Sequence, residues 1–172
     1  MQIYLRQSVE SDAEDIMNVI NQAKAFLKSY GSPQWQDGHP NMGMIKADIA
    51  AGISYVLIVD GQVAGTAALQ NTPDPNYKDI YDGQWVKADT PYATIHRIAV
   101  STKLRGHHLA SYLLSNLLSA GLAQGIHNFR YDTHAVNLPM QKLGEAMGFQ
   151  KRGIVYVQDK IDRRRIGFEL NL

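Results

Sequence analysis

The chain has 172 residues, and 17 Lys and Arg residues against 16 Asp and Glu residues give a formal net charge of +1 at pH 7. This balance argues against a nucleic-acid partner, and the absence of cysteine excludes disulfides and thiolate chemistry. Since no long apolar run occurs, neither a membrane partner nor a signal peptide is expected, and we predict a cytoplasmic protein with one domain over residues 1–172.

The first 52 residues predict one strand followed by two helices. We expect the strand at residues 2–6, and residues 11–14 match a capping box that opens a helix. The apolar face of this helix repeats at helical spacing and comprises Ile16, Val19, Ile20, Ala23 and Leu27. After a turn-rich loop at residues 31–40, a second helix is predicted at residues 42–51, with Gly52 as its stop.

The middle of the chain predicts a hairpin and then a long connection. The β-prone runs at residues 54–59 and 62–69 are joined by Asp60-Gly61, a two-residue sequence that favours a tight hairpin turn. Residues 71–91 carry three prolines and many polar side chains. We therefore expect them to form an excursion over the surface near the functional site.

The second half predicts a strand-helix-strand unit and a closing hairpin. Strands at residues 92–100 and 128–133 flank a helix at residues 109–123, which implies parallel pairing of the two strands. The last hairpin is predicted from strands at residues 149–157 and 165–170. Its end carries a basic cluster that we expect to be solvated: Arg163, Arg164 and Arg165.

A β-like run, a short basic turn and an amphipathic helix follow one another in residues 94–118. A helix start offers unpaired N–H groups and a partial positive charge, which favour an anion such as a diphosphate. The strand end at residues 98–100 and the turn from Arg105 to Ala110 resemble the GNAT superfamily of acyl-CoA-dependent N-acyltransferases, whose motif is Arg/Gln-x-x-Gly-x-Gly/Ala. His108 stands where that family usually has glycine, so the turn must accept a side chain there.

A second segment resembles the same family. Asn137 is predicted as the N-cap of a helix with Pro139 in its first turn, and Gly148 as the left-handed stop of that helix. The predicted order β-α-α-β-β-β-α-β-α-β-β matches the GNAT topology, an α/β (α+β) fold with a mixed central sheet of about six to seven strands and about four flanking helices. The resemblance implies acetyl-CoA as co-substrate, bound by Ile98, Ala99, Val100, Arg105, Gly106, His107, His108, Leu109, Ala110, Asn137 and Met140.

His96 is the candidate general base. Strand alternation predicts that Thr94, His96, Ile98 and Val100 share one face. If that face lines the acceptor cleft, the imidazole can take a proton from the amine directly or through water, since an unperturbed histidine titrates near pH 6.5. Some family members are similar in carrying a base on this strand. The alternatives are a buried structural histidine or one paired with a carboxylate such as Asp132.

The acid that protonates the departing thiolate has no obvious candidate. Many family members place a tyrosine immediately after the leucine that matches Leu143, but this chain has Gly144 there. Tyr131, His134 and Tyr156 lie on or beside strands expected to border the cofactor. Of these, Tyr156 is named as the candidate catalytic residue beside His96, and solvent remains an alternative proton source.

The acceptor is expected to be a small amine or a peptide. Trp35, Tyr92 and His134 are the candidate substrate-binding residues, because they offer aromatic faces and polar handles, while a tryptophan that packs in the core is the alternative for Trp35. The six histidines lack ligand spacing, so no metal is expected. The predicted function is direct acetyl transfer from acetyl-CoA. An acyl-CoA-binding sensor or scaffold is the alternative, and a homodimer is compatible with either.

Overall fold

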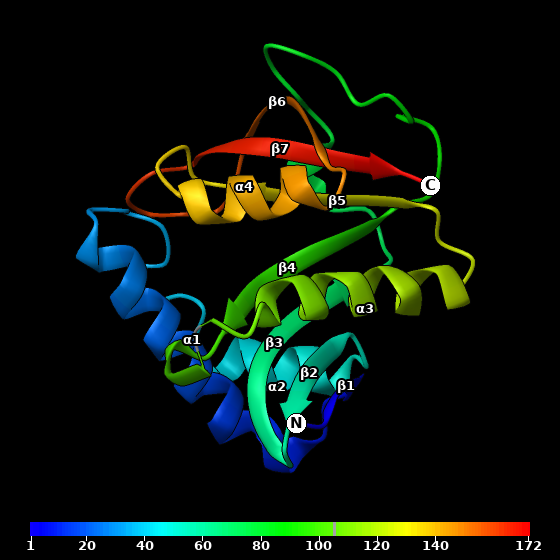
Figure 1. Ribbon diagram of the computed structural model, residues 1–172. Helices are drawn as coiled ribbons and strands as arrows, with labels where there is room; N and C mark the ends of the chain where they lie inside the picture. The colour runs from blue at the N-terminus through cyan, green and yellow to red at the C-terminus, as the bar shows by residue number, and fades with distance from the viewer. Residues whose placement is uncertain (105) are drawn as a thin grey trace.

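A computed structural model describes residues 1–104 and 106–172. Within these ranges, seven strands form one mixed sheet flanked by four α-helices, in the predicted order (Figure 1). The strands are β1 (Ile3–Gln7), β2 (Ser54–Val59), β3 (Gln62–Gln70), β4 (Ala93–Val100), β5 (Asn128–Thr133), β6 (Gln150–Tyr156) and β7 (Arg164–Asn171). The helices are α1 (Ala13–Ser29), α2 (Met42–Ala50), α3 (Leu109–Ala123) and α4 (Leu138–Ala146).

The sheet order is β1-β2-β3-β4-β5-β7-β6, and β4 and β5 are parallel whereas the other neighbours are antiparallel. Helices α3 and α4 cover one face, over a core that includes Leu57, Leu113, Phe129 and Phe168. Helix α1 covers the other face together with α2 (Figure 1). None of the helices in the described ranges combines the length and apolar character that a membrane crossing requires.

Local sequence signals explain most of these elements. The apolar stripe of α1 is buried as predicted except at Ala23, which is partly buried. Asp60 and Gly61 both adopt positive φ in the β2–β3 turn. The predicted capping box is wrong, because α1 begins at Ala13 after a 3₁₀ turn at Glu10–Asp12. Asp12 accepts the Val9 N–H at 2.8 Å and pairs with Arg6, so its carboxylate caps the earlier turn.

Tyr77, Trp85 and Tyr92 of residues 71–92 pack on the sheet face opposite α3 and α4, and Tyr81 pairs with Ile154 on the edge strand β6. Arg130 on β5 anchors them: its guanidinium lies between the rings of Trp85 and Tyr92, at 4.2 and 3.9 Å from their centroids. The same guanidinium bonds to Glu169 on β7 in a pair whose side chains are 2% and 0% exposed. The guanidinium thus bonds to Glu169 and also makes cation–π contacts with the two rings. These contacts hold residues 71–92 against the C-terminal part of the sheet.

A bulge in β4 overturns the predicted face of that strand. Arg97 adopts a left-handed φ of 54°, and the register with β3 shifts between Thr66 and Ala68. The extra residue reverses the alternation, so Ile98 and Val100 pack against the α3 side of the sheet. His96 lies before the bulge and remains on the opposite face, which the sequence pattern alone did not indicate.

Strands β4 and β5 pair only where they begin. Their registered pairs within the described residues are Ala93 with Phe129 and Thr94 with Arg130. Beyond Thr94 the two strands diverge, and β4 swings away from β5 toward α1 (Figure 1). The two strands therefore leave a gap in the ladder beyond Thr94.

Candidate active site

A cavity of about 480 Å³ lies between the diverging strands β4 and β5. Its volume lies within the range of about 300–1,000 Å³ that is usual for small-ligand sites. Residues 95–102 of β4 and the turn after it form one wall, and residues 131–133 of β5 form the opposite one. Because β4 and β5 separate, the cavity passes from the α3–α4 face of the sheet to the face where His96 lies.

The end of the cavity on the α3–α4 face, which we call the cofactor end, contains part of the predicted cofactor set. Its lining includes Ile98, Val100, Ala110, Asn137 and Met140, whereas Ala99, which also lines the cavity, belongs to the core on the α1–α2 face. Asn137 caps α4 as predicted, since its Oδ1 accepts the Met140 N–H at 3.3 Å. Its Nδ2 donates to Thr133 Oγ1 at 3.0 Å, which fixes the amide beside the end of β5.

His108, where the GNAT family usually has glycine, adopts a backbone conformation that favours glycine. This residue is the N-cap of α3 and adopts φ 54° and ψ 29°, the left-handed conformation that glycine takes without strain. Gly106 also has a positive φ, and His107 and His108 are exposed beside the cavity rather than among its lining residues. Leu109 is buried in the core. The predicted role of Arg105 lies outside the described residues.

His96 faces the other end of the cavity, which we call the acceptor end. Its Nε2 lies 2.9 Å from Asp74 Oδ2, and the side chains are 19% and 5% exposed. The Asp74 carboxylate also accepts the Asn76 N–H at 2.8 Å, while the Asp74 N–H donates to the Tyr92 hydroxyl. The partner of His96 is therefore Asp74, from the 71–92 excursion, and not the Asp132 considered from the sequence.

The charge on Asp74 determines which ring nitrogen of His96 carries the proton. Burial opposes ionisation of Asp74, but the hydrogen bond and the charge of His96 outweigh it and hold the Asp74 pKa below its usual value. An ionised carboxylate accepts only, so Nε2 carries the proton that it donates. Nδ1 is then the nitrogen that can take a proton in the neutral imidazole.

Asp132 forms a second buried carboxyl beside this pair. It accepts the Tyr77 hydroxyl at 2.7 Å and lies 3.8 Å from Arg165. Burial raises the pKa of Asp132, and Tyr77, His96 and Arg165 offset only part of that effect. The same burial, with the Asp132 charge, raises the pKa of Tyr77 well above its usual value. The acceptor end thus combines an ionised carboxylate with one that resists ionisation.

Comparison with known proteins assigns the chain to a family. The model of the acetyltransferase (GNAT) family matches residues 20–149, which is most of the chain. The chain belongs to the GNAT acetyltransferase family. A search among curated proteins found no match.

Solved structures agree with this membership. An acetyltransferase of the GNAT family from Streptococcus agalactiae is 34% identical, with a TM-score of 0.90 over 99% of this chain and 95% of the other. A GNAT acetyltransferase from Listeria monocytogenes is 21% identical, with a TM-score of 0.74 over 99% and 95% of the two chains. A chain of the NatC complex bound to Gag peptide and CoA shares the fold at 14% identity, with a TM-score of 0.69 over 100% and 99%.

The departure from the GNAT motif at Gly144 has a steric cause. A Cβ at this position would lie 1.8 Å from the Tyr131 hydroxyl, which reaches across from β5 and donates to Met140 O at 3.3 Å. Tyr131 lines the cavity, and burial raises its pKa, so the phenol stays protonated at neutral pH. A tyrosine ring from the neighbouring strand therefore occupies the space that a side chain at 144 would need.

The candidate catalytic residue Tyr156 and the candidate substrate-binding residue His134 lie away from the described cavity lining. Tyr156 is 43% exposed and packs edge-on against Tyr81, because alternation along β6 buries Val155 and turns Tyr156 outward. His134 is buried, and both ring nitrogens have partners: Nδ1 accepts the Val136 N–H, and Nε2 lies 2.8 Å from Asp162. Neither is placed to act on a ligand in the cavity.

Of the two aromatic residues predicted to bind the substrate, Trp35 lines the cavity and Tyr92 does not. Trp35 lines the acceptor end and has a positive φ of 65°. Tyr92 is outside the described lining, stacks against Tyr77, and supports Asp74 through its hydroxyl. Its contribution to the site is therefore to hold the partner of His96.

The sequence reasoning considered Asp132 only as a possible partner of His96 and missed the other two carboxylates that lie with it at the acceptor end. Asp37, Asp132 and Asp159 all line it, from a loop, a strand and a hairpin turn. Arg165 was expected in solvent, but it is 3% exposed and binds Asp159 at 2.7 Å. The one available signal was position in the last hairpin: Asp159 lies near the start of the predicted turn and Arg165 directly after it, so the two side chains can meet.

Proposed function

We propose that this protein transfers an acetyl group from acetyl-CoA to a primary amine by direct attack of the amine on the thioester. The observation that carries the proposal is the position of His96. It is oriented by an ionised aspartate and faces one end of a cavity whose other end is lined by part of the predicted cofactor set, including Val100, Ala110 and Asn137. The family membership supports the same class of reaction.

The residues at the cofactor end fit acetyl-CoA. Beyond Thr94, β4 has no registered partner in the described part of β5, so its backbone groups can bond to an extended ligand that carries amides. The lining of Ile98, Val100 and Met140 is apolar, and the N-terminus of α3 favours a diphosphate. When bound, acetyl-CoA would supply the activated acyl group.

The acceptor end supplies the proton chemistry. An amine must lose a proton in order to attack or immediately afterwards, and His96 Nδ1 is the nitrogen that can take it. Asp74 holds the imidazole through Nε2 and stabilises the charge that develops when Nδ1 is protonated. Of the three alternatives named for the thiolate acid, Tyr131 lines the cavity whereas Tyr156 and His134 do not.

A release assay for free thiol, with acetyl-CoA and a panel of amines, tests the proposal. We expect turnover in the wild type, and His96→Gln should reduce kcat by about 100- to 10,000-fold, the range typical of general-base loss. Calorimetry should show unchanged affinity for CoA in the variant, because His96 lies at the opposite end of the cavity. Turnover that is insensitive to His96→Gln would contradict the assigned base.

The sensor alternative makes a different prediction in the same experiment. It requires acetyl-CoA binding with no thiol release for any amine, and no effect of His96→Gln other than on stability. Failure of the chain to bind CoA at all would remove both functions. The two assays together therefore separate transfer, binding alone and neither.

A further inference from the structure

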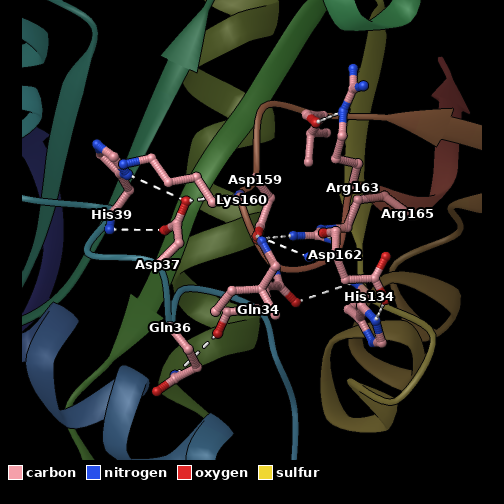
Figure 2. Close-up of polar contacts among 12 residues, drawn as sticks. Gln34, Gln36, Asp37, His39, His134, Asp159, Lys160, Asp162, Arg163 and Arg165 are labelled. Atoms are coloured by element: carbon pink, nitrogen blue, oxygen red, sulfur yellow. Dashed lines mark hydrogen bonds and ion pairs between the residues drawn. The ribbon is translucent and has the colours of Figure 1, made fainter.

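Two loops distant in the sequence are bonded to each other around the acceptor end. The first is the α1–α2 loop, residues 31–41, and the second is the β6–β7 loop, residues 157–163. Both line the cavity, the first through Trp35 and Asp37 and the second through Val157 and Asp159. Figure 2 shows the polar contacts that join them.

The α1–α2 loop is held at two points. Gln34 Oε1 accepts from the His134 N–H at 3.2 Å and from Thr133 Oγ1 at 3.3 Å, which ties this loop to the end of β5. The Asp37 carboxylate accepts the Lys160 N–H at 3.3 Å, which ties it directly to the β6–β7 loop. The side chains of Gln34 and Asp37 are both buried. The Gln34 bonds lie in the interior, whereas the Asp37–Lys160 bond is exposed.

The β6–β7 loop is held in the same position from its own side. His134 Nε2 lies 2.8 Å from Asp162 Oδ2, and Arg165 binds Asp159 at 2.7 Å. Asp159 also accepts the Ile161 and Asp162 N–H groups, which folds the loop inward over its carboxylate. Thus the first loop, the end of β5 and the second loop form a connected wall.

We infer that the acceptor is a small free amine rather than the N-terminus or a lysine of a polypeptide, because the two loops that border the acceptor end are bonded to each other across it. This inference rests on the proposed function. A polypeptide acceptor continues beyond its reactive residue and needs an open path between these loops. The Asp37–Lys160 bond and the Gln34 and His134 bonds occupy that path, whereas a small amine ends within the cavity.

The test compares acceptors that share one reactive amine. Full-length protein, acetyl-CoA and a series with a common N-terminal residue are assayed for thiol release: the amino-acid amide, then tri-, hexa- and decapeptide amides. A panel of simple primary amines is assayed alongside. We expect kcat/KM to fall at least about tenfold from the best small amine to the decapeptide. Equal or greater kcat/KM for the decapeptide would overturn the inference.

Variants that loosen the wall give an independent readout. Asp37→Ala removes the acceptor of the Lys160 N–H, and Asp162→Ala, at a half-exposed position, releases His134. Each should bring the ratio of kcat/KM for the best small amine to kcat/KM for the decapeptide closer to one. Asp89 is an exposed carboxylate in the 71–92 excursion, and Asp89→Ala should leave this ratio unchanged. An unaltered ratio in both folded wall variants would refute the assigned role of the wall.

The result also separates this inference from the proposed function. If peptides are acetylated as well as small amines, the transferase assignment stands and only the size limit fails. If acetyl-CoA binds but no acceptor of any size releases thiol, the transferase assignment fails and the inference fails with it. Should a wall variant not fold, the wild-type acceptor series still decides the question.

Discussion

The two ends of the cavity are built in different ways. The cofactor end consists of a strand end, a helix start and a helix cap, each formed by residues close together in the sequence, such as Asn137 and Met140. The acceptor end depends on bonds between distant segments: His96 with Asp74, Tyr77 with Asp132, and Asp37 with Lys160. The first is therefore set by backbone conformation, whereas the second is set by buried polar pairs that single substitutions can break.

The largest expected effect is at the cofactor end, where Gly144→Ala tests the packing of Tyr131. Because the added Cβ would lie 1.8 Å from the Tyr131 hydroxyl, the ring must move, and we expect a loss of about 2–3 kcal/mol in the free energy of unfolding. Urea denaturation measures it. Gly43→Ala, in α2, is the matched control and should differ from wild type by less than about 1 kcal/mol. An unchanged urea midpoint for Gly144→Ala would contradict the packing described.

The next effect concerns the acceptor end, where Asp74→Asn keeps the shape but removes the charge beside His96. We expect kcat to fall about tenfold with little change in KM for acetyl-CoA, because the amide holds the imidazole less firmly and does not stabilise its charged form. In a His96→Gln background the same change should have almost no further effect on kcat. Additive losses would show that Asp74 acts independently of His96.

A smaller effect is expected at the start of α3, where His108→Gly should relieve left-handed strain. We expect a gain of about 1 kcal/mol in the free energy of unfolding, measured by urea denaturation. His108→Ala is the control that removes the imidazole but keeps the Cβ, so it should not give this gain. A gain of equal size in both variants would assign the effect to the side chain and not to the backbone.

The smallest effect is the pH dependence of the Asp162–His134 contact. The hydrogen bond from His134, with the Arg164 N–H, lowers the pKa of Asp162. A carboxyl whose pKa is lower in the folded protein stabilises it above the ordinary value near 3.9, and that stability is lost as the pH falls through the folded pKa. Because the Asp162 side chain is half-exposed, the contact should contribute less than about 1 kcal/mol.

Thermal unfolding between pH 3 and pH 7 measures this contribution. The difference between wild type and Asp162→Asn should be constant above about pH 5 and should vanish in stronger acid. Asp89→Asn, which alters an exposed carboxylate elsewhere, should show no comparable trend. A difference that grows as the pH falls would contradict a lowered pKa for Asp162.

The sequence by itself determined the order of the elements, most of their boundaries and the helix cap at the cofactor end. These follow from short-range physics: period 3.6 in α1, Asp60-Gly61 at a hairpin turn, Asn137 as a cap and Gly148 as a left-handed stop. Such short-range signals also placed His96 on β4, the strand that lines the cavity. Each signal lies within a few residues of the structure it produces.

Only the tertiary structure decided the acceptor end. One bulge residue, Arg97, reversed the face of the strand after His96, and no alternation pattern indicates such an insertion. Packing also decided that Tyr131 fills the space at Gly144, and that Asp74 rather than Asp132 bonds to His96. These outcomes depend on which distant side chains meet in the folded chain, and a bond between residues more than twenty positions apart leaves no periodic trace in the sequence.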